Sequence, residues 1–370
     1  GFGHSDNVLR SFENVIDADF YVFGIDADLL LVRPNFEFLL LSDLDYLLYD
    51  DDAVRDRPDG QLDARLTWNI VDDRVAWYVQ DTYLQVRDDP TAGAAPDNLR
   101  EMNVLMTGVD ALLPLGERNS LNVFASYSGR NGETELAIDS TDVSAGVGLI
   151  RQISSTRSLG FMLSGSLIEY DDLVPVDYEI LRGFVRYESR LASGQVQVDV
   201  GANKVSSDVS NFDSGTLPML DLSWRREIAA RSNVSVVLSH QISDIGLSAT
   251  TRADGGGGLG GTARLNPVSN PFEESRAEVS WTTRHDLTTW SLSLGGLNQE
   301  FNDPDVEDFD IVYVSASIGR EFSRGWRIER FGFSGERNEQ GSADQGRDSN
   351  ARFSVGKDLG RRMELVLSYL

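Results

Sequence analysis

Long runs in which apolar and polar side chains alternate are the feature that most limits what this chain can form. In residues 62–70 every second side chain is apolar and those between are polar: Leu62, Ala64, Leu66, Trp68 and Ile70 against Asp63, Arg65, Thr67 and Asn69. Successive side chains of a β-strand point to opposite faces, so this period of two predicts a strand and not a helix. The pattern recurs in residues 181–191, 194–203 and 289–295.

Short turns divide these runs at regular intervals. Their nine predicted centres lie near Pro34, Asp73, Glu117, Ser155, Ser193, Arg231, Asp286, Arg324 and Gly360. Successive centres are 39, 44, 38, 38, 38, 55, 38 and 36 residues apart, and one glycine-rich insertion from Thr250 accounts for the longest interval. Longer polar connections, rich in turn-forming residues, separate the hairpins. Nine hairpins predict eighteen strands.

Three architectures have repeated strands: a propeller, a soluble sandwich and a barrel. A propeller also repeats at about 40 residues, but each blade divides into four short strands. The runs here last about twelve to sixteen residues, longer than the 5–6 usual in globular sheets, and this favours a transmembrane barrel. We therefore expect an all-β fold, with residues 1–370 as one domain: a single closed antiparallel transmembrane β-barrel with short periplasmic turns and longer extracellular loops.

The positions of the two chain ends change the number of strands that we expect in the native barrel. With the short turns periplasmic, the first long run descends and the last one ascends, so both ends lie away from the periplasm. A complete barrel of this class has an even number of strands and both termini on the periplasmic side. We therefore expect a chain trimmed at both ends and a native barrel of about twenty strands.

All six tryptophans lie within about seven residues of a short turn, and none lies in a long connection. Tryptophans of a soluble core would be scattered along the strands, whereas those of a membrane-interface girdle gather at one level. The sequence therefore predicts that the apolar faces meet lipid in a bacterial outer membrane. The predicted aromatic girdle consists of Trp68, Trp77, Trp224, Trp281, Trp290 and Trp326.

Charge is both unbalanced and segregated. Lysine and arginine number 33 against 59 aspartates and glutamates, for a formal net charge of −26, which argues against a nucleic-acid partner. Each short turn has an arginine nearby, whereas the long connections hold clusters of acids, as in residues 50–52. The absence of cysteine excludes disulfides and thiolate metal sites. The extracellular rim is thus expected to be acidic and the periplasmic rim basic.

The first fifty residues carry a resemblance to a known family. Asp6-Asn7-Val8, the acids Asp17 and Asp19, Pro34 at the first turn, and Leu44-Asp45-Tyr46 resemble the outer-membrane β-barrel porin family often found with exopolysaccharide export systems. Beyond residue 50 only the hairpin rhythm matches, and the usual C-terminal aromatic residue is missing. The resemblance implies polysaccharide passage or general permeation, with polysaccharide and periplasmic export components as partners besides the lipid bilayer and lipopolysaccharide.

Charged residues opposite the apolar faces are the candidate functional residues. They are Arg65, Arg182, Arg186, Glu188, Arg190, Asp199, Arg276 and Arg284. A packed core would not tolerate unpaired charges, but a barrel of eighteen or more strands leaves an aqueous lumen that hydrates them. These lumen-lining candidates form either a guiding surface for an anionic solute or an ordinary polar lining neutralised by Glu188, Asp199 and Glu278.

Signals of catalysis and of metal binding are weak. His4, His240 and His285 show no paired ligand spacing, and no nucleophile–base pair is visible in the sequence. Asp303, Asp305 and Glu307 alternate as in calcium loops, but the glycine and the glutamate of an EF-hand are absent. They form either a weak divalent-cation contact or a solvated acidic loop. We expect no cofactor, no structural metal and no enzyme activity.

Three function classes follow, in order of preference. The first is a channel that passes hydrophilic solutes, with exopolysaccharide export as the special case that the resemblance implies. The second is a structural or adhesive surface barrel, and the third is a membrane enzyme. The sequence leaves the oligomeric state open. An open lumen would favour permeation, whereas a filled one would favour a structural role.

Overall fold

The computed structural model describes most of the chain. The described residues are 2–5, 16–51, 54, 56–72, 74–87, 98–132, 139–170, 177–207, 215–243, 262–263, 271–301, 308–322, 326–340, 344–358 and 364–369. Within these ranges the structure contains strands and no α-helix, so no helix there is long and apolar enough to cross a membrane.

Seventeen strands of 12 to 16 residues make up most of the fold, together with three shorter ones. The first ten are β1 (Phe2–Ser5), β2 (Ala18–Val32), β3 (Phe36–Tyr49), β4 (Arg57–Val71), β5 (Val75–Arg87), β6 (Leu99–Pro114), β7 (Asn119–Gly132), β8 (Ser140–Ser154), β9 (Arg157–Tyr170) and β10 (Tyr178–Leu191). The others are β11 (Gly194–Ser207), β12 (Thr216–Ala229), β13 (Ser232–Ser243), β14 (Thr262–Ala263), β15 (Phe272–His285), β16 (Thr288–Phe301), β17 (Phe309–Glu321), β18 (Trp326–Gln340), β19 (Asp344–Asp358) and β20 (Glu364–Tyr369).

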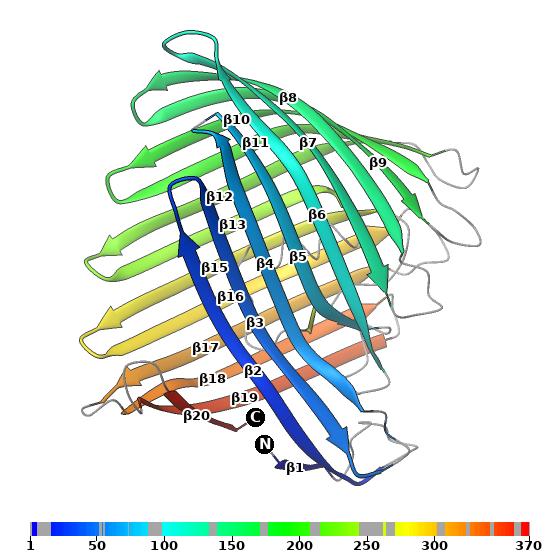
Figure 1. Cartoon of the computed structure of the whole chain (residues 1–370), viewed down its shortest axis with the longest axis vertical. Coiled ribbons are helices and arrows are strands. Elements are labelled where there is room, and N and C mark those ends of the chain that lie inside the picture. The colour runs from blue at the N-terminus through cyan, green and yellow to red at the C-terminus, as the bar shows by residue number, and fades with distance from the viewer. Residues whose placement is uncertain are drawn as a thin grey trace.

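Each strand except β14 pairs antiparallel with its neighbours in chain order, and β13 pairs directly with β15. The nine predicted hairpins are confirmed: β2–β3, β4–β5, β6–β7, β8–β9, β10–β11, β12–β13, β15–β16, β17–β18 and β19–β20. Figure 1 shows the single sheet curling into a barrel, with β2 to β6 crossing obliquely in front of β12 to β19. Among the described residues no pairing joins β20 to β1 or β2, so closure of the barrel stays a prediction.

The outer face of the sheet carries the aliphatic side chains. Trp68, Val200, Leu292 and Leu294 are exposed by 46 to 56 %, as the alternation predicts. Leu62, Leu66, Val196 and Val198 lie on the same face but are half-buried. Neighbours in the adjacent strands cover them, because paired side chains on one face stand only about 5 Å apart. An exposed aliphatic surface of this extent requires an apolar surrounding.

The inner face changes in burial along β10 and β15. The turn end of a strand is here the end joined by a short turn, and the loop end is the end joined by a long connection. On β10 the inner face begins at the loop end with buried Tyr178 and Ile180, passes through half-buried Arg186 and ends with exposed Arg190. On β15 it likewise runs from buried Phe272 to residues that are exposed at the turn end. Along these two strands the inner face is therefore buried at the loop end and exposed at the turn end.

Candidate functional site

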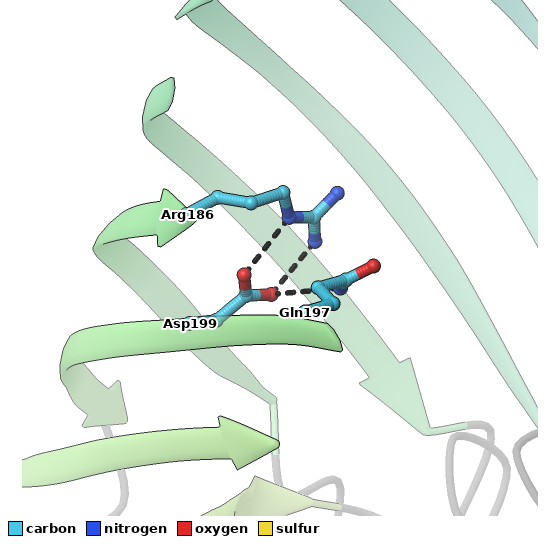
Figure 2. Close-up of polar contacts among 3 residues, drawn as sticks. All are labelled: Arg186, Gln197 and Asp199. Atoms are coloured by element: carbon cyan, nitrogen blue, oxygen red, sulfur yellow. Dashed lines mark hydrogen bonds and ion pairs between the residues drawn. The ribbon is translucent and has the colours of Figure 1, made fainter. Parts of the chain in front are cut away.

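A charge pair on β10 and β11 lies midway along the inner face. Arg186 and Asp199 are direct partners in the β10–β11 ladder, so their side chains leave the sheet side by side. The Arg186 Nε donates to Asp199 Oδ1 at 2.9 Å and its Nη2 to Oδ2 at 2.8 Å, while Gln197 Nε2 donates to Oδ2 at 3.4 Å (Figure 2). The Asp199 side chain is only 3 % exposed, against 33 % for Arg186. This two-point geometry fixes the guanidinium while leaving one edge of it toward the lumen.

A second polar group lies on β15 and β17. Arg276 Nη2 lies 2.8 Å from Glu278 Oε2, and the Tyr313 hydroxyl donates to the same oxygen at 2.6 Å. Toward the loop end, the Gln299 amide donates to Glu274 at 3.1 Å. Each arginine of these two groups thus has a carboxylate partner, as expected for a neutralised lining.

The other predicted lumen residues lie on the inner face in separate places. Arg182 Nη2 donates to the Ile242 carbonyl at 3.4 Å, and Arg65 lies 6.0 Å from the centre of the Tyr78 ring. At the turn end Arg284 Nη2 lies 3.0 Å from Glu321 Oε1. The two remaining candidates are half-buried Glu188, which accepts from Ser158 at 3.5 Å, and exposed Arg190. These side chains spread along the lumen and form no single cluster, and their role in solute passage stays a prediction.

One inward amide has no protein partner. Asn203 lies on the inner face of β11, four residues from Asp199 toward the loop end, and is 0 % exposed. Neither its amide nitrogen nor its amide oxygen has a hydrogen-bond partner. A buried amide without a partner costs free energy, so this position is an unfavourable point of the inner face.

Five of the six tryptophans share the outer face near the turn end. Trp68 and Trp77 are ladder partners, and Trp77 Nε1 donates to Thr107 at 3.0 Å. The indole of Trp281 donates to Ser232 at 3.0 Å. Half-buried Trp224 and exposed Trp290 are the other two of the five. The sixth, Trp326, is also exposed and is the first residue of β18. This is the placement expected of an interface girdle, and the girdle itself stays a prediction.

Metal-binding candidates lie elsewhere. Asp303, Asp305 and Glu307 fall outside the described residues. Within the described ranges no group of three or more histidine, cysteine, aspartate or glutamate residues could hold a metal ion.

Sequence reasoning missed one contact between a potential nucleophile and a potential base. His240 Nδ1 lies 2.8 Å from the Ser275 hydroxyl, and His240 Nε2 lies 3.2 Å from Glu273 Oε1. A short turn would have fixed the register of β13 and β15 and so allowed this contact to be predicted. Because 28 residues separate the two strands, their register cannot be predicted from the sequence. The contact brings together a potential nucleophile and a potential base, which the sequence alone does not reveal.

A two-residue strand within the long insertion pairs far from its neighbours in the chain. β14 belongs to the chain between β13 and β15, yet Thr262 and Ala263 pair in parallel with Gln85 and Val86 of β5. From β13 to β5 the sheet counts eight steps, close to half of its seventeen long strands. The chain that leaves one side of the barrel therefore contacts the opposite side at the loop end.

β4 does not pair with the loop end of β5, and β14 pairs with β5 there instead. The β4–β5 ladder runs only as far as the pair Leu62–Tyr83. Just beyond it Gly60 has a φ of 121°, and any side chain there would collide with the Asp43 carbonyl. Glycine accepts this conformation at little cost, so β4 bends away from β5 and a second strand can pair there.

Comparison with solved structures gives the class of fold. The apoprotein of the FrpB iron transporter from Neisseria meningitidis, variant F5-1, superposes with a TM-score of 0.52 and 8 % identity, over 96 % of this chain and 66 % of that one. The F3-3 variant gives 0.51 and 9 %, over 93 % and 65 %. This is a β-barrel of the outer-membrane type. The chain spans about two thirds of the length of these transporters. No family profile and no curated protein matches the sequence.

Proposed function

We propose that the barrel passes hydrophilic solutes across the outer membrane through its lumen. The observation that carries this proposal is the inner face of β10 and β11, which is polar, charge-paired and open toward the turn end. A barrel of this strand number is too wide for side chains alone to fill, and its hydrated charges need water beside them.

The solute that this lining fits best is a neutral or weakly charged saccharide. Arg186 and Arg276 are each paired with a carboxylate, so the lining offers hydrogen bonds without a strong field of one sign. Exopolysaccharide export is the special case that the family resemblance implies. The two solved structures are variants of one iron transporter, and its name supports transport as the activity proposed for this barrel.

A structural or adhesive surface barrel is the second candidate. The inward side chains at the loop end favour it, because Tyr178, Phe272 and Phe309 are at most 2 % exposed. A lumen filled there would conduct little, so conductance separates the two candidates.

Charge reversal inside the lumen tests the first candidate. The purified barrel in a planar bilayer is expected to give small, stable conductance steps. The variant Arg182→Glu/Arg186→Glu should shift its ion preference toward cations, because Arg186→Glu places a third carboxylate beside Asp199 and Asp221. The measurement is the reversal potential in a salt gradient.

Lys204→Glu is the matched control, since Lys204 is exposed on the outer face of β11 beside Leu181. It should leave the reversal potential unchanged. An equal shift in the control, or no shift in the double variant, would contradict an ion path along β10 and β11.

A further inference from the structure

We propose that Ser275, His240 and Glu273 form a second functional site, a serine hydrolase site on the lipid-facing surface. Its substrate class is the fatty acyl ester of a lipid in the outer leaflet. The site lies on the opposite face of the sheet from the lumen, so it is independent of solute passage.

The three side chains are connected in the order that acyl transfer needs. Ser275 Oγ lies 2.8 Å from His240 Nδ1, and the other ring nitrogen lies 3.2 Å from Glu273 Oε1. With the proton on Nε2, the imidazole donates to the glutamate and its Nδ1 accepts the serine proton. A nucleophile, a base within hydrogen-bond reach and an acid that orients the base form the pattern of a catalytic triad, which is recognised by roles and not by position in the chain.

The register places this group on the outer face. Inward Ser239 pairs with Arg276, so the next pair along the ladder, His240 with Ser275, points outward. Their row continues through Asn298 to Asp310, which are bonded to each other at 3.0 Å. One polar row thus crosses four strands. The His240 and Glu273 side chains are 28 % and 24 % exposed, so a lipid can reach them.

The polar row borders the apolar surface. The three rows beneath it, toward the turn end, are Leu238–Ala277–Gly296–Val312, Val236–Val279–Leu294–Val314 and Val234–Trp281–Leu292–Ala316. Eight residues separate Asn298 from Trp290, about 27 Å along the strand and about 21 Å across the membrane at a tilt of about 40°. The apolar band of such barrels is about 25 Å tall. Ser275 therefore lies near the upper edge of the band, the level at which lipid ester groups lie.

Asn298 is positioned as the donor for the developing negative charge. It is the ladder partner of Ser275 on β16, so their side chains leave the sheet next to each other. One hydrogen of its Nδ2 goes to Asp310, and the second remains for a carbonyl oxygen of the substrate. A single side-chain amide donor of this kind contributes about 10²–10³ in rate in serine hydrolases.

The reaction uses only the lipid and water. Ser275 Oγ attacks the ester carbonyl carbon while its proton passes to His240 Nδ1, and Asn298 stabilises the oxyanion. The bond from the carbonyl carbon to the alcohol oxygen breaks, and the alcohol leaves with the proton from His240. Water, deprotonated by His240, then hydrolyses the acyl-serine to a free fatty acid and restores Ser275. Glu273 is a positioning residue that holds the imidazole in the required tautomer.

An active-site probe tests the nucleophile directly. The full chain, folded in detergent, is treated with an alkyl fluorophosphonate, and the labelled residue is identified by peptide mass spectrometry. We expect labelling of Ser275, loss of labelling in Ser275→Ala, and at least a 100-fold slower reaction in His240→Ala. Ser280→Ala is the matched control, because Ser280 lies on the same strand but faces the lumen beside Ser235. It should label like the parent.

Assays with two kinds of lipid vesicle then identify which lipid supplies the ester. The barrel is reconstituted in phosphatidylethanolamine vesicles or in vesicles that contain lipopolysaccharide, and fatty acid release is measured. Release in one arm, abolished by Ser275→Ala, names the substrate. Glu273→Gln should lower the rate and shift its pH profile, which a merely structural role would not do. No labelling of Ser275 in the folded barrel overturns the proposal, and so does labelling without fatty acid release in either arm.

Discussion

Replacing Leu294 by arginine is expected to destabilise the folded barrel by about 2–4 kcal/mol, the cost of an arginine at the middle of the lipid face of such barrels. Leu294 is 56 % exposed on the outer face of β16. Its row neighbours Val279 and Val314 are also apolar and exposed, so no partner for a guanidinium lies within the row. Reversible urea unfolding in phospholipid vesicles, followed by tryptophan fluorescence, measures the change in free energy of unfolding.

The next residue along β16 supplies the control. Ser293 is half-buried on the inner face, where Ser280 and Ser315 are its ladder partners. Arginine at this position extends into the hydrated lumen, so Ser293→Arg should cost less than about 1 kcal/mol. A larger loss for Ser293→Arg than for Leu294→Arg would reverse the assignment of the two faces.

Deleting residues 250–268 is expected to raise the conductance of the barrel several-fold. The deletion removes β14, which pairs with β5 on the opposite side of the barrel at the loop end. Barrels of 16 to 18 strands have an aqueous channel unless a segment occupies it. Single-channel recording gives the conductance, and swelling of proteoliposomes in a neutral oligosaccharide measures passage of the proposed class of solute.

Deletion of residues 133–138 between β7 and β8 is the control. It shortens another long connection without removing a described strand, so the conductance should change little. A barrel that does not conduct after either deletion would contradict the proposed channel and favour the structural alternative. Leakage of equal size after both deletions would show general damage to the loop end.

The hairpins and the two faces could be predicted because both depend on local sequence. A period of two fixes which side chains share a face, and a tight turn fixes the register of the strands it joins. The predicted strand over residues 62–71 therefore lies within β4, and that over 195–206 lies within β11. Arg186 and Asp199 face each other for the same reason, since only the Leu191–Gly194 turn separates their strands.

The other features of the structure could not be predicted, because they depend on contacts between segments that are far apart in the sequence. The burial of Tyr178 and Phe309 depends on what occupies the lumen at the loop end. The contact of His240 with Ser275 depends on the register of two strands separated by a long insertion. The pairing of β14 with β5 requires that two sides of the barrel approach each other. The alternation predicts on which face of the sheet a side chain lies. It does not predict which residues contact that side chain from strands that no short turn joins to its own.

The β14–β5 contact also affects the order in which the protein can fold. Thr262 and Gln85 are 177 positions apart in the chain (262 minus 85), whereas no pair between the long strands exceeds the 51 positions from Ser232 to Thr283. Short-range hairpins can join the growing sheet one after another, because each closes a small loop. β14 finds its partner only after β5 to β13 have curved around, and it contributes just two residue pairs. This contact should therefore form last and open first, so amide hydrogens of Thr262 and Ala263 should exchange well before those of the sheet.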